Sequence, residues 1–238
     1  MEIIYASNYE DMSRKAAIAI AQQVIKKPTS VLGFATGSTP LRTYEILIEY
    51  HRQGIVDFSC INTFNLDEYI GLSSDHPQSY SFFMLKNLFR QIQLDPSRIH
   101  IPLGTALDLS RECADYEEAI QSLGGIDFQL LGLGSNGHIG FNEPGVHFNS
   151  ITHVVSLSQE TIKANSRFFI NLEEVPKKAI TMGIKSIMNT RKILLLVSGE
   201  KKAEIIRQAL SGPISKEIPA SVLQLHPNAT VVIDQSIL

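Results

Sequence analysis

Short apolar runs alternate with amphipathic helical segments along most of this sequence, and no other feature restricts the possible fold as strongly. This alternation favours βαβ units arranged around a mostly parallel sheet. The predicted strands are residues 2–6, 30–35, 61–65, 126–131, 178–182, 192–197 and 229–233. The predicted helices are residues 10–26, 40–53, 79–92, 109–123, 158–168 and 200–211.

Nothing in the sequence divides the chain into separate domains. We find no internal repeat, no low-complexity tract and no long linker. A chain of 238 residues is long enough to bury a sizeable core. We therefore expect one domain, residues 1–238, with a doubly wound α/β fold.

Charge and composition exclude several classes of partner. The net charge is −3 and no basic stripe is present, so we expect no nucleic-acid partner. The N-terminus does not resemble a signal peptide, and the longest aliphatic run, residues 193–197, is far shorter than the roughly 20 residues that cross a bilayer. Two cysteines, Cys60 and Cys113, suit a reduced chain without a disulfide framework. A cytoplasmic protein without a membrane partner is expected.

The segment 126–145, IDFQLLGLGSNGHIGFNEPG, predicts a buried strand that opens into a glycine-rich polar loop. In parallel sheets, ligands bind beyond the carboxyl ends of the strands, so this loop is a candidate site. Residues 132–137 match the letters of the dinucleotide motif G-x-G-x-x-G. That motif must open directly into a helix, which Gly140 and Pro144 prevent. We expect instead that the glycines let the backbone approach a different ligand closely.

His138 and Glu143 share this loop with Asn136. A histidine with a carboxylate partner is a general acid/base arrangement, because the carboxylate fixes the tautomer of the ring and stabilises the imidazolium. The alternative is a structural histidine that ties the loop together. Metal binding is disfavoured, since His138, His147 and His153 lack the helical spacing of common zinc motifs.

Two further loops follow predicted strands. The segment Gly37-Ser38-Thr39-Pro40 leads into a helix, and a helix N-terminus with capping hydroxyls attracts a phosphate or carboxylate. An ordinary capped turn is the alternative. Asp67 follows the strand 61–65 and is expected on the same rim of the sheet, where a partly desolvated carboxylate could act as a general base. A pair of solvated acids, Asp67 and Glu68, is the alternative there.

Three basic residues are candidates for binding an anion, although each alone suits an ordinary surface. Arg167 ends one predicted helix, and arginine forks match the geometry of phosphate. Lys201 and Lys202 begin another helix, where their charge opposes the macrodipole unless an anion is bound.

These residues resemble the glucosamine-6-phosphate deaminase family, also called glucosamine-6-phosphate isomerases, over nearly the whole chain. The matching segments are GFATGSTP at 33–40, TFNLDEY at 63–69, HPQSY at 76–80, GLGSNGHIGFNEPG at 132–145, ANSRFF at 164–169 and LQLHPN at 223–228. The resemblance implies a Rossmann-like domain that converts D-glucosamine 6-phosphate and water to D-fructose 6-phosphate and ammonia. It implies no metal and no redox cofactor.

The resemblance also implies roles for individual residues. Asp67 is the expected base that moves a proton between C2 and C1 of the opened sugar. His138, aided by Glu143 and Asn136, is the expected acid/base that opens the pyranose ring. The expected phosphate cradle comprises Gly37, Ser38, Thr39, Arg167 and Lys202.

Two departures from the family pattern lead to further expectations. Several members carry aspartate where this chain has Asn136, so no role that needs a negative charge is available at this position, and we expect Glu143 alone to supply the charge that supports His138. Allosteric members are longer and carry basic residues near the positions of His153 and Val155, so we expect no activation by N-acetylglucosamine 6-phosphate. The sequence leaves open a monomer or a homo-oligomer.

Two rival functions remain open at this stage. The first is hydrolysis of 6-phosphogluconolactone on the same fold, which also uses a phosphosugar and a histidine-bearing loop. The second is a sugar-phosphate sensor without turnover, although two separate acid/base groups, Asp67 and His138, argue against it.

Overall fold

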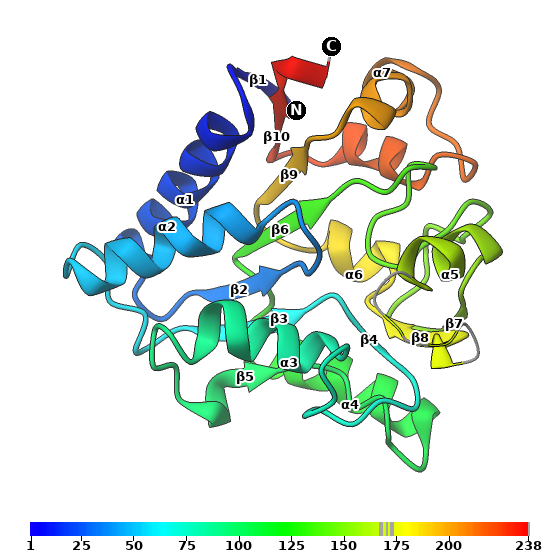
Figure 1. The fold of residues 1–238 in the computed structure, drawn as a ribbon, viewed down its shortest axis with the longest axis horizontal. Coiled ribbons are helices and arrows are strands. Elements are labelled where there is room, and N and C mark those ends of the chain that lie inside the picture. Colours follow the sequence, from blue (N-terminus) through cyan, green and yellow to red (C-terminus); the bar gives the residue numbers. More distant parts are fainter. Residues whose placement is uncertain (167–168, 170, 172–173, 238) are drawn as a thin grey trace.

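A computed structural model describes residues 1–166, 169, 171 and 174–237 of the chain (Figure 1). Seven parallel strands form the main sheet in the order β1-β10-β9-β6-β2-β3-β5. Their bounds are β1 Glu2–Ala6, β2 Val31–Phe34, β3 Asn62–Asn65, β5 Ile99–His100, β6 Phe128–Gly132, β9 Ile193–Val197 and β10 Ala229–Asp234. The predicted doubly wound α/β fold is confirmed.

Helices cover both faces of this sheet. One core cluster joins α1 (Tyr9–Lys26), α2 (Leu41–Arg52) and the π-helix Leu85–Phe89 to one face. The other cluster joins α4 (Leu109–Ser122), α6 (Ile184–Met188) and α7 (Ala203–Ser211) to the opposite face. Strands buried on both faces need continuous apolar runs, which explains why β9 is ILLLV and fully buried.

Local sequence explains where several helices begin and how they attach. The side chain of Asn8 accepts a hydrogen bond from the Asp11 amide at 2.9 Å and caps α1.

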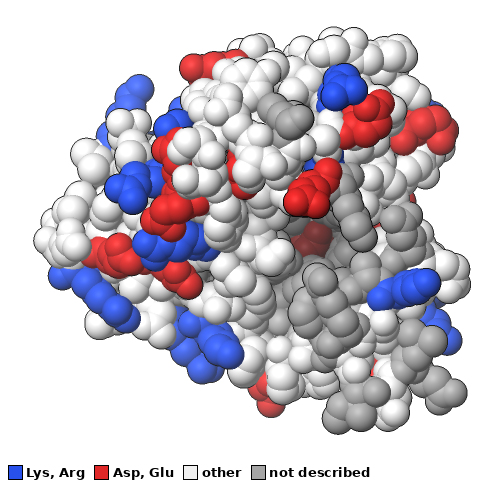
Figure 2. Space-filling view, turned by 45° about the horizontal axis from the view of Figure 1, so that its top comes forward, with Lys and Arg blue, Asp and Glu red and all other residues white. Residues whose placement is uncertain are grey.

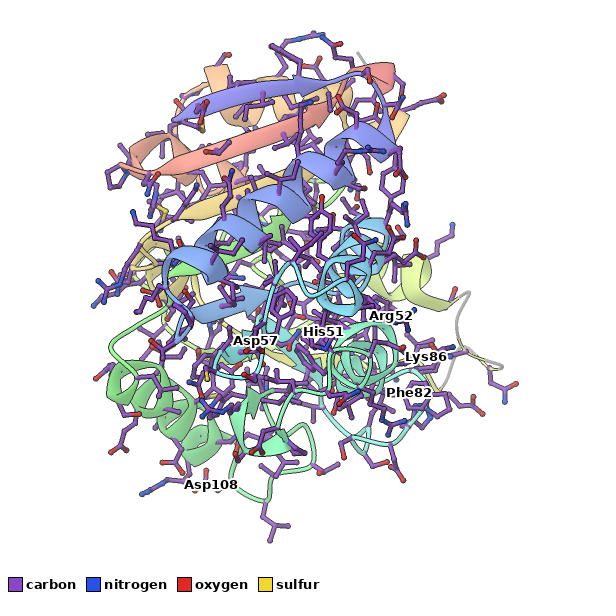
Figure 3. The ribbon with its side chains drawn as sticks, turned by 90° about the vertical axis from the view of Figure 1, so that its left-hand side faces the viewer. His51, Arg52, Asp57, Phe82, Lys86 and Asp108 are labelled. Atoms are coloured by element: carbon purple, nitrogen blue, oxygen red, sulfur yellow. The ribbon has the colours of Figure 1, made fainter. Side chains whose placement is uncertain are left out.

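The end of α2 is attached to the segment around the π-helix. Arg52 donates a hydrogen bond to Gln91 at 2.8 Å. Figure 3 shows Arg52 and Lys86, a residue of the π-helix, on the same side of the molecule. The predicted helix 79–92 is an α-helical turn, α3 (Tyr80–Met84), that continues as the π-helix.

The predicted strand 178–182 forms, but its expected place in the parallel sheet is wrong. It is β8 (Lys178–Thr181), the centre of a separate antiparallel sheet between β4 (Asp67–Tyr69) and β7 (His153–Ser156). Its apolar residues are buried, so the pattern could not distinguish this strand from a buried parallel one. The sequence prediction also missed the short elements β4, β5, β7 and α6.

Two other helix predictions differ from the structure in detail. The helix predicted at 158–168 is α5 (Gln159–Asn165), and residues 167 and 168 lie outside the described residues. The helix predicted at 200–211 begins with a 3₁₀ turn, Glu200–Lys202, before α7.

The sheet reverses its winding direction between β2 and β6. From β2 the chain extends the sheet through β3 and β5, and it then returns to add β6 on the other side of β2. Loops leaving neighbouring strands diverge at such a point and leave a crevice at the carboxyl edge. The loops after β2, β3, β6 and β9 therefore meet around one space.

Candidate active site

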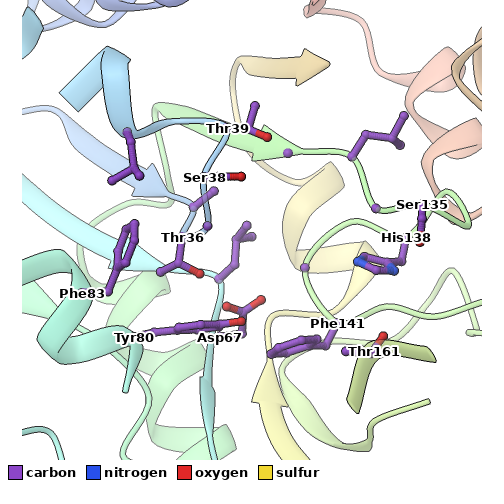
Figure 4. A pocket seen from close by; sticks show the side chains of 18 of the residues that line it. Thr36, Ser38, Thr39, Asp67, Tyr80, Phe83, Ser135, His138, Phe141 and Thr161 are labelled. Carbon is purple, nitrogen blue, oxygen red and sulfur yellow. The ribbon is translucent and has the colours of Figure 1, made fainter. Parts of the chain in front are cut away.

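A cavity of about 830 Å³ opens at this carboxyl edge. Figure 2 shows its mouth as a hollow in the surface, with acidic atoms visible inside. The segments after β2, β6 and β9 contribute Ser38, His138 and Lys202 to its lining, and β4, which follows β3, contributes Asp67. The structure thus brings together candidates that are far apart in the sequence (Figure 4).

Asp67 lies in the cavity wall and is only 6 % exposed. Within the described part of the chain, no hydrogen-bond donor reaches its carboxyl group and no cation pairs with it. Burial raises the pKa of Asp67 to about 8, and the neighbouring charge of Glu68 contributes to this rise. The alternative of a solvated acid pair is wrong, since Glu68 is 2 % exposed.

The antiparallel sheet fixes Asp67 relative to the loop after β6. Thr181 of β8 pairs with Asp67 in the register of the sheet. The hydroxyl of Thr181 accepts a hydrogen bond from the backbone amide of Phe141 at 3.0 Å. The side chain of Asn142 also donates to the carbonyl of Met182 at 2.8 Å. β8 and the residue that follows it therefore fix the positions of Asp67 and of the loop after β6 relative to each other.

The glycines of this loop let it turn tightly beside Asp67. Gly140 has φ +58, and a Cβ there would lie 3.0 Å from the Thr181 hydroxyl and 3.5 Å from a carboxylate oxygen of Asp67. At Gly134 a Cβ would lie 2.2 Å from Nε2 of His138. No helix follows the G-x-G-x-x-G letters in residues 133–152, all of which are described, so the expectation that Gly140 and Pro144 prevent an immediate helix is confirmed.

The imidazole of His138 is held by its Nδ1 atom. Oδ1 of Asn136 lies 2.7 Å from that atom, while the nearest carboxylate oxygen of Glu143 is 3.5 Å away. Nδ2 of Asn136 donates to the same Glu143 carboxylate at 2.7 Å. Asn136 is therefore the nearer partner of the ring, and Glu143 is the carboxylate beside it.

Glu143 carries the negative charge of this group. Burial opposes its ionisation, but hydrogen bonds from His138, Thr161 and Asn136 outweigh burial and lower the pKa of Glu143 to about 2. Ser158 adds a further donor at 3.1 Å. The carboxylate is therefore ionised at neutral pH, and Asn136 lies between it and the ring of His138.

The loop after β2 presents unpaired donors to the cavity. Gly37 has φ +92, and Ser38 and Thr39 line the cavity beside it. Among the described residues, neither hydroxyl has a hydrogen-bond partner. The expected hydroxyl cap of α2 is absent, since Pro40 occupies the N-cap position without a side-chain cap bond. These two hydroxyls, next to the positive end of α2, suit a phosphate or carboxylate.

Lys202 adds a positive charge to the same cavity. It follows the turn at Gly199, whose φ is +98, and it makes no ion pair within the described part of the chain. Burial lowers the pKa of Lys202. Arg167, the other cationic candidate, lies outside the described residues, and so does the side chain of Lys201.

Sequence reasoning missed several residues of the cavity wall. They are mostly hydroxyl-bearing or aromatic, and they include Thr36, Tyr69, Tyr80, Ser135, Phe141 and Thr161. Thr36 and Ser135 lie inside motifs that had already been singled out. Tyr69, Tyr80 and Phe141 also lie inside segments that resemble the family, but their residue pattern does not differ from that of core residues.

His147 and His153, the other two histidines considered as metal ligands, have separate partners. His147 lies 3.0 Å from Nζ of Lys216, and His153 contacts the carbonyl of Ile151 at 2.7 Å. Among the described residues, no group of three or more histidine, cysteine, aspartate or glutamate side chains is arranged to hold a metal. No described helix is long and apolar enough to cross a membrane.

Comparison with known proteins identifies close relatives. A glucosamine-6-phosphate deaminase of Thermoanaerobacter pseudethanolicus is 55% identical over 235 residues, which is 99% of this chain and 93% of that protein. The deaminase of Lachnoclostridium phytofermentans is 56% identical over 232 residues, which is 98% of each chain.

Solved structures agree with these relatives. A monomeric glucosamine-6-phosphate deaminase superposes with a TM-score of 0.97 at 50% identity, covering 100% of both chains. A 6-phosphogluconolactonase from Trypanosoma cruzi reaches a TM-score of 0.80 at 19% identity, covering 99% of this chain and 95% of its own, and shares the fold.

A family model agrees with both comparisons. Residues 6–232 match the model described as glucosamine-6-phosphate isomerases/6-phosphogluconolactonase. This range includes every candidate residue in the cavity. The chain therefore belongs to the family of glucosamine-6-phosphate isomerases and 6-phosphogluconolactonases.

Proposed function

We propose that this chain is a glucosamine-6-phosphate deaminase, which converts D-glucosamine 6-phosphate and water to D-fructose 6-phosphate and ammonia. The observation that carries the proposal is a buried carboxyl group, Asp67, which no described residue pairs with and which shares its cavity with His138, a histidine held by Asn136 and Glu143. The reaction needs two acid/base groups at different atoms. High identity to curated deaminases over 99% of the chain supports the assignment.

Ring opening is the step that we assign to His138. Because Asn136 presents its oxygen to Nδ1, that nitrogen carries the proton in the neutral ring, and Nε2 is left with a lone pair. Nε2 accepts the proton of the sugar O1 hydroxyl and returns a proton to the ring oxygen, so the C1–O5 bond breaks and an aldehyde forms. Glu143 stabilises the intermediate imidazolium.

Isomerisation is the step that we assign to Asp67. The C2 proton of the open-chain sugar becomes acidic beside the C1 carbonyl. Asp67 takes this proton, the C–H electron pair forms a C1=C2 double bond, and the C1=O electron pair moves to O1, which takes a proton from solvent water. Asp67 then protonates C1, which leaves an iminium at C2. Water adds to C2 and ammonia leaves, giving the ketone of fructose 6-phosphate.

Phosphate binding is the role that we assign to Gly37, Ser38, Thr39, Lys202 and Arg167. The unpaired donors before α2 and the positive charge of Lys202 support this for the four residues that are described. Fixing the phosphate at one end orients C1 and C2 between His138 and Asp67.

One assay tests the proposed function. The wild-type protein is incubated with D-glucosamine 6-phosphate, and both ammonia and fructose 6-phosphate are measured. Equal amounts of the two products are expected. Hydrolysis of 6-phosphogluconolactone without ammonia release would replace the proposal with the lactonase function, and binding without either reaction would favour a sensor.

We also propose that the enzyme acts as a monomer with hyperbolic kinetics in the cytoplasm. One chain supplies all described groups of the cavity, and the solved relative at 50% identity is described as monomeric. His153 and Val155 of β7 stand near the positions where allosteric members carry basic residues. Cys60 and Cys113 are unpaired, which suits a reducing compartment. Sigmoidal kinetics relieved by N-acetylglucosamine 6-phosphate would contradict this proposal.

A further inference from the structure

Glu68 is a buried carboxylate for which the proposed reaction has no direct use. Its side chain is 2 % exposed, and no described cation pairs with it. Its partners are backbone amides. Oε1 accepts from Tyr69 at 2.8 Å and from Tyr80 at 2.9 Å, and Oε2 accepts from Ser81 at 2.8 Å. Three backbone donors hold this carboxylate in one orientation.

These hydrogen bonds connect the strand that carries Asp67 with the first turn of α3. Glu68 and Asp67 are neighbours in β4, and successive side chains of a strand point to opposite faces. Asp67 can therefore face the cavity while Glu68 holds the amides of Tyr80 and Ser81 behind it. The hydroxyl of Ser79 accepts from the next amide, that of Phe82, at 3.0 Å.

The residue held most directly by Glu68 is Tyr80, which forms a wall of the cavity. Its ring lies parallel to that of Phe141, with 5.9 Å between centroids and 12° between planes. Its hydroxyl donates to the hydroxyl of Tyr69 at 3.1 Å. Figure 4 shows Tyr80 alongside Asp67, on the opposite side of the cavity from His138. Aromatic rings at this position keep water away from Asp67.

We propose that Glu68 is a positioning residue of this site, which holds Tyr80 against Asp67 and places a second carboxyl group, bound by three backbone amides, next to the base. The inference rests on the proposed deaminase function, because it concerns the strength of the base in that reaction. Abstraction of a proton from carbon is favoured by a strong base, and a carboxylate gains base strength from desolvation and from a nearby like charge.

Burial is the larger cause of the raised pKa of Asp67, and the charge of Glu68 adds to it. The titratable groups that interact with Asp67 are Glu68 and Tyr69 of β4, Tyr80 of α3 and Tyr116 of α4. Burial raises the pKa of each tyrosine, so these three side chains stay neutral in the working range of the enzyme. His138 and Lys202 line the same cavity farther along the loops after β6 and β9.

The test compares Glu68→Gln with the wild-type enzyme in the pH dependence of kcat/KM for ammonia release. Glutamine keeps the shape and one acceptor but removes the charge. We expect the acid limb of the profile to move to lower pH by about one unit, the size of a charge interaction across a partly buried site. We also expect kcat to fall by about tenfold, because the amide cannot accept from Ser81 as the carboxylate does.

Two further variants separate charge from position. Glu68→Asp keeps the charge but shortens the side chain, so we expect the acid limb to stay in place while kcat falls. Glu118→Gln removes a charge from an exposed position on α4 and should change neither quantity. Circular dichroism and thermal unfolding check that each variant is folded.

The outcomes are distinct. An unchanged acid limb in Glu68→Gln would show that Glu68 is merely structural, and an unchanged kcat would overturn its role in positioning. If Glu68→Gln does not fold, wild-type kcat in Glu68→Asp would overturn that role instead. Absence of ammonia release by the wild-type protein would refute the proposed function itself, which none of the variant results would do.

Discussion

Oδ1 of Asn136 lies 2.7 Å from Nδ1 of His138, within hydrogen-bonding distance. The orientation of this amide follows from chemistry. The Glu143 carboxylate accepts hydrogen bonds and cannot donate them when ionised, so the NH₂ group of Asn136 must face it at 2.7 Å. The oxygen of Asn136 then faces the ring. A neutral asparagine can therefore transmit the effect of Glu143 to His138, which reserves Nε2 for the substrate.

This arrangement predicts the effect of changing Asn136. Asn136→Asp should keep kcat within about tenfold, because an aspartate oxygen can still accept from Nδ1 of His138. Asn136→Leu removes the acceptor and should lower kcat by about 10²-fold. Steady-state ammonia release measures both. Equal rates for the leucine variant and the wild type would show that Asn136 does not fix the ring.

Asp67→Asn should abolish turnover. Asparagine has nearly the same shape but cannot accept the C2 proton, so we expect kcat to fall by about 10²- to 10⁴-fold. Binding of a non-reactive phosphosugar such as sorbitol 6-phosphate should be retained, because the phosphate-binding groups are unchanged. Calorimetry with this ligand measures binding and ammonia release measures kcat. A fully active variant would contradict the role of Asp67 as the base.

The sequence predicts the main sheet well, because its strands are buried on both faces and its helices are amphipathic. It predicts the small sheet poorly. β4 and β7 span only 3 and 4 residues, too few for a periodic pattern, and β8 resembles a buried parallel strand. Their pairing brings Thr181 to both Asp67 and Phe141, and such long-range contacts leave no local trace in the sequence.

The candidate site was likewise predictable from the sequence only in part. Asp67, His138 and Ser38 follow predicted strands, so their meeting at one edge can be predicted from topology. The wall residue Tyr80 belongs to a turn and a short helix whose position depends on hydrogen bonds to Glu68. Backbone amides are the donors that bind Glu68, and every residue except proline has one. The residue pattern therefore does not reveal which amides Glu68 will bind.

Lys202 should contribute mainly to substrate affinity. Lys202→Gln removes the positive charge near the unpaired donors of Ser38 and Thr39, and we expect KM to rise by about 10- to 100-fold with a small change in kcat. Lys202→Arg should recover part of the affinity. Lys185→Gln, at an exposed position outside the cavity, serves as the control and should leave KM unchanged. A lower kcat at unchanged KM would contradict a role in phosphate binding.

Removing the charge of Asp67 should stabilise the fold while it removes activity. The folded-state pKa of Asp67, about 8, lies above its ordinary value of 3.8. The folded protein thus holds a proton that the unfolded chain releases between these pH values. Stability from this group is present below about pH 4 and is lost as pH rises through 8. Asp67→Asn stays neutral at every pH. Near pH 8.5 its free energy of unfolding should therefore exceed that of the wild type by on the order of 2 to 5 kcal/mol.

Urea unfolding of wild type and Asp67→Asn at pH 4 and pH 8.5 measures this difference. The two proteins should have similar free energies of unfolding at pH 4, where Asp67 is protonated in the folded state. The variant should be the more stable at pH 8.5. Asp115→Asn alters a half-exposed carboxylate, so its effect should stay within about 1 kcal/mol at both pH values. Equal stability of Asp67→Asn and wild type at pH 8.5 would mean that Asp67 ionises in the folded protein without cost, as a solvated carboxylate does.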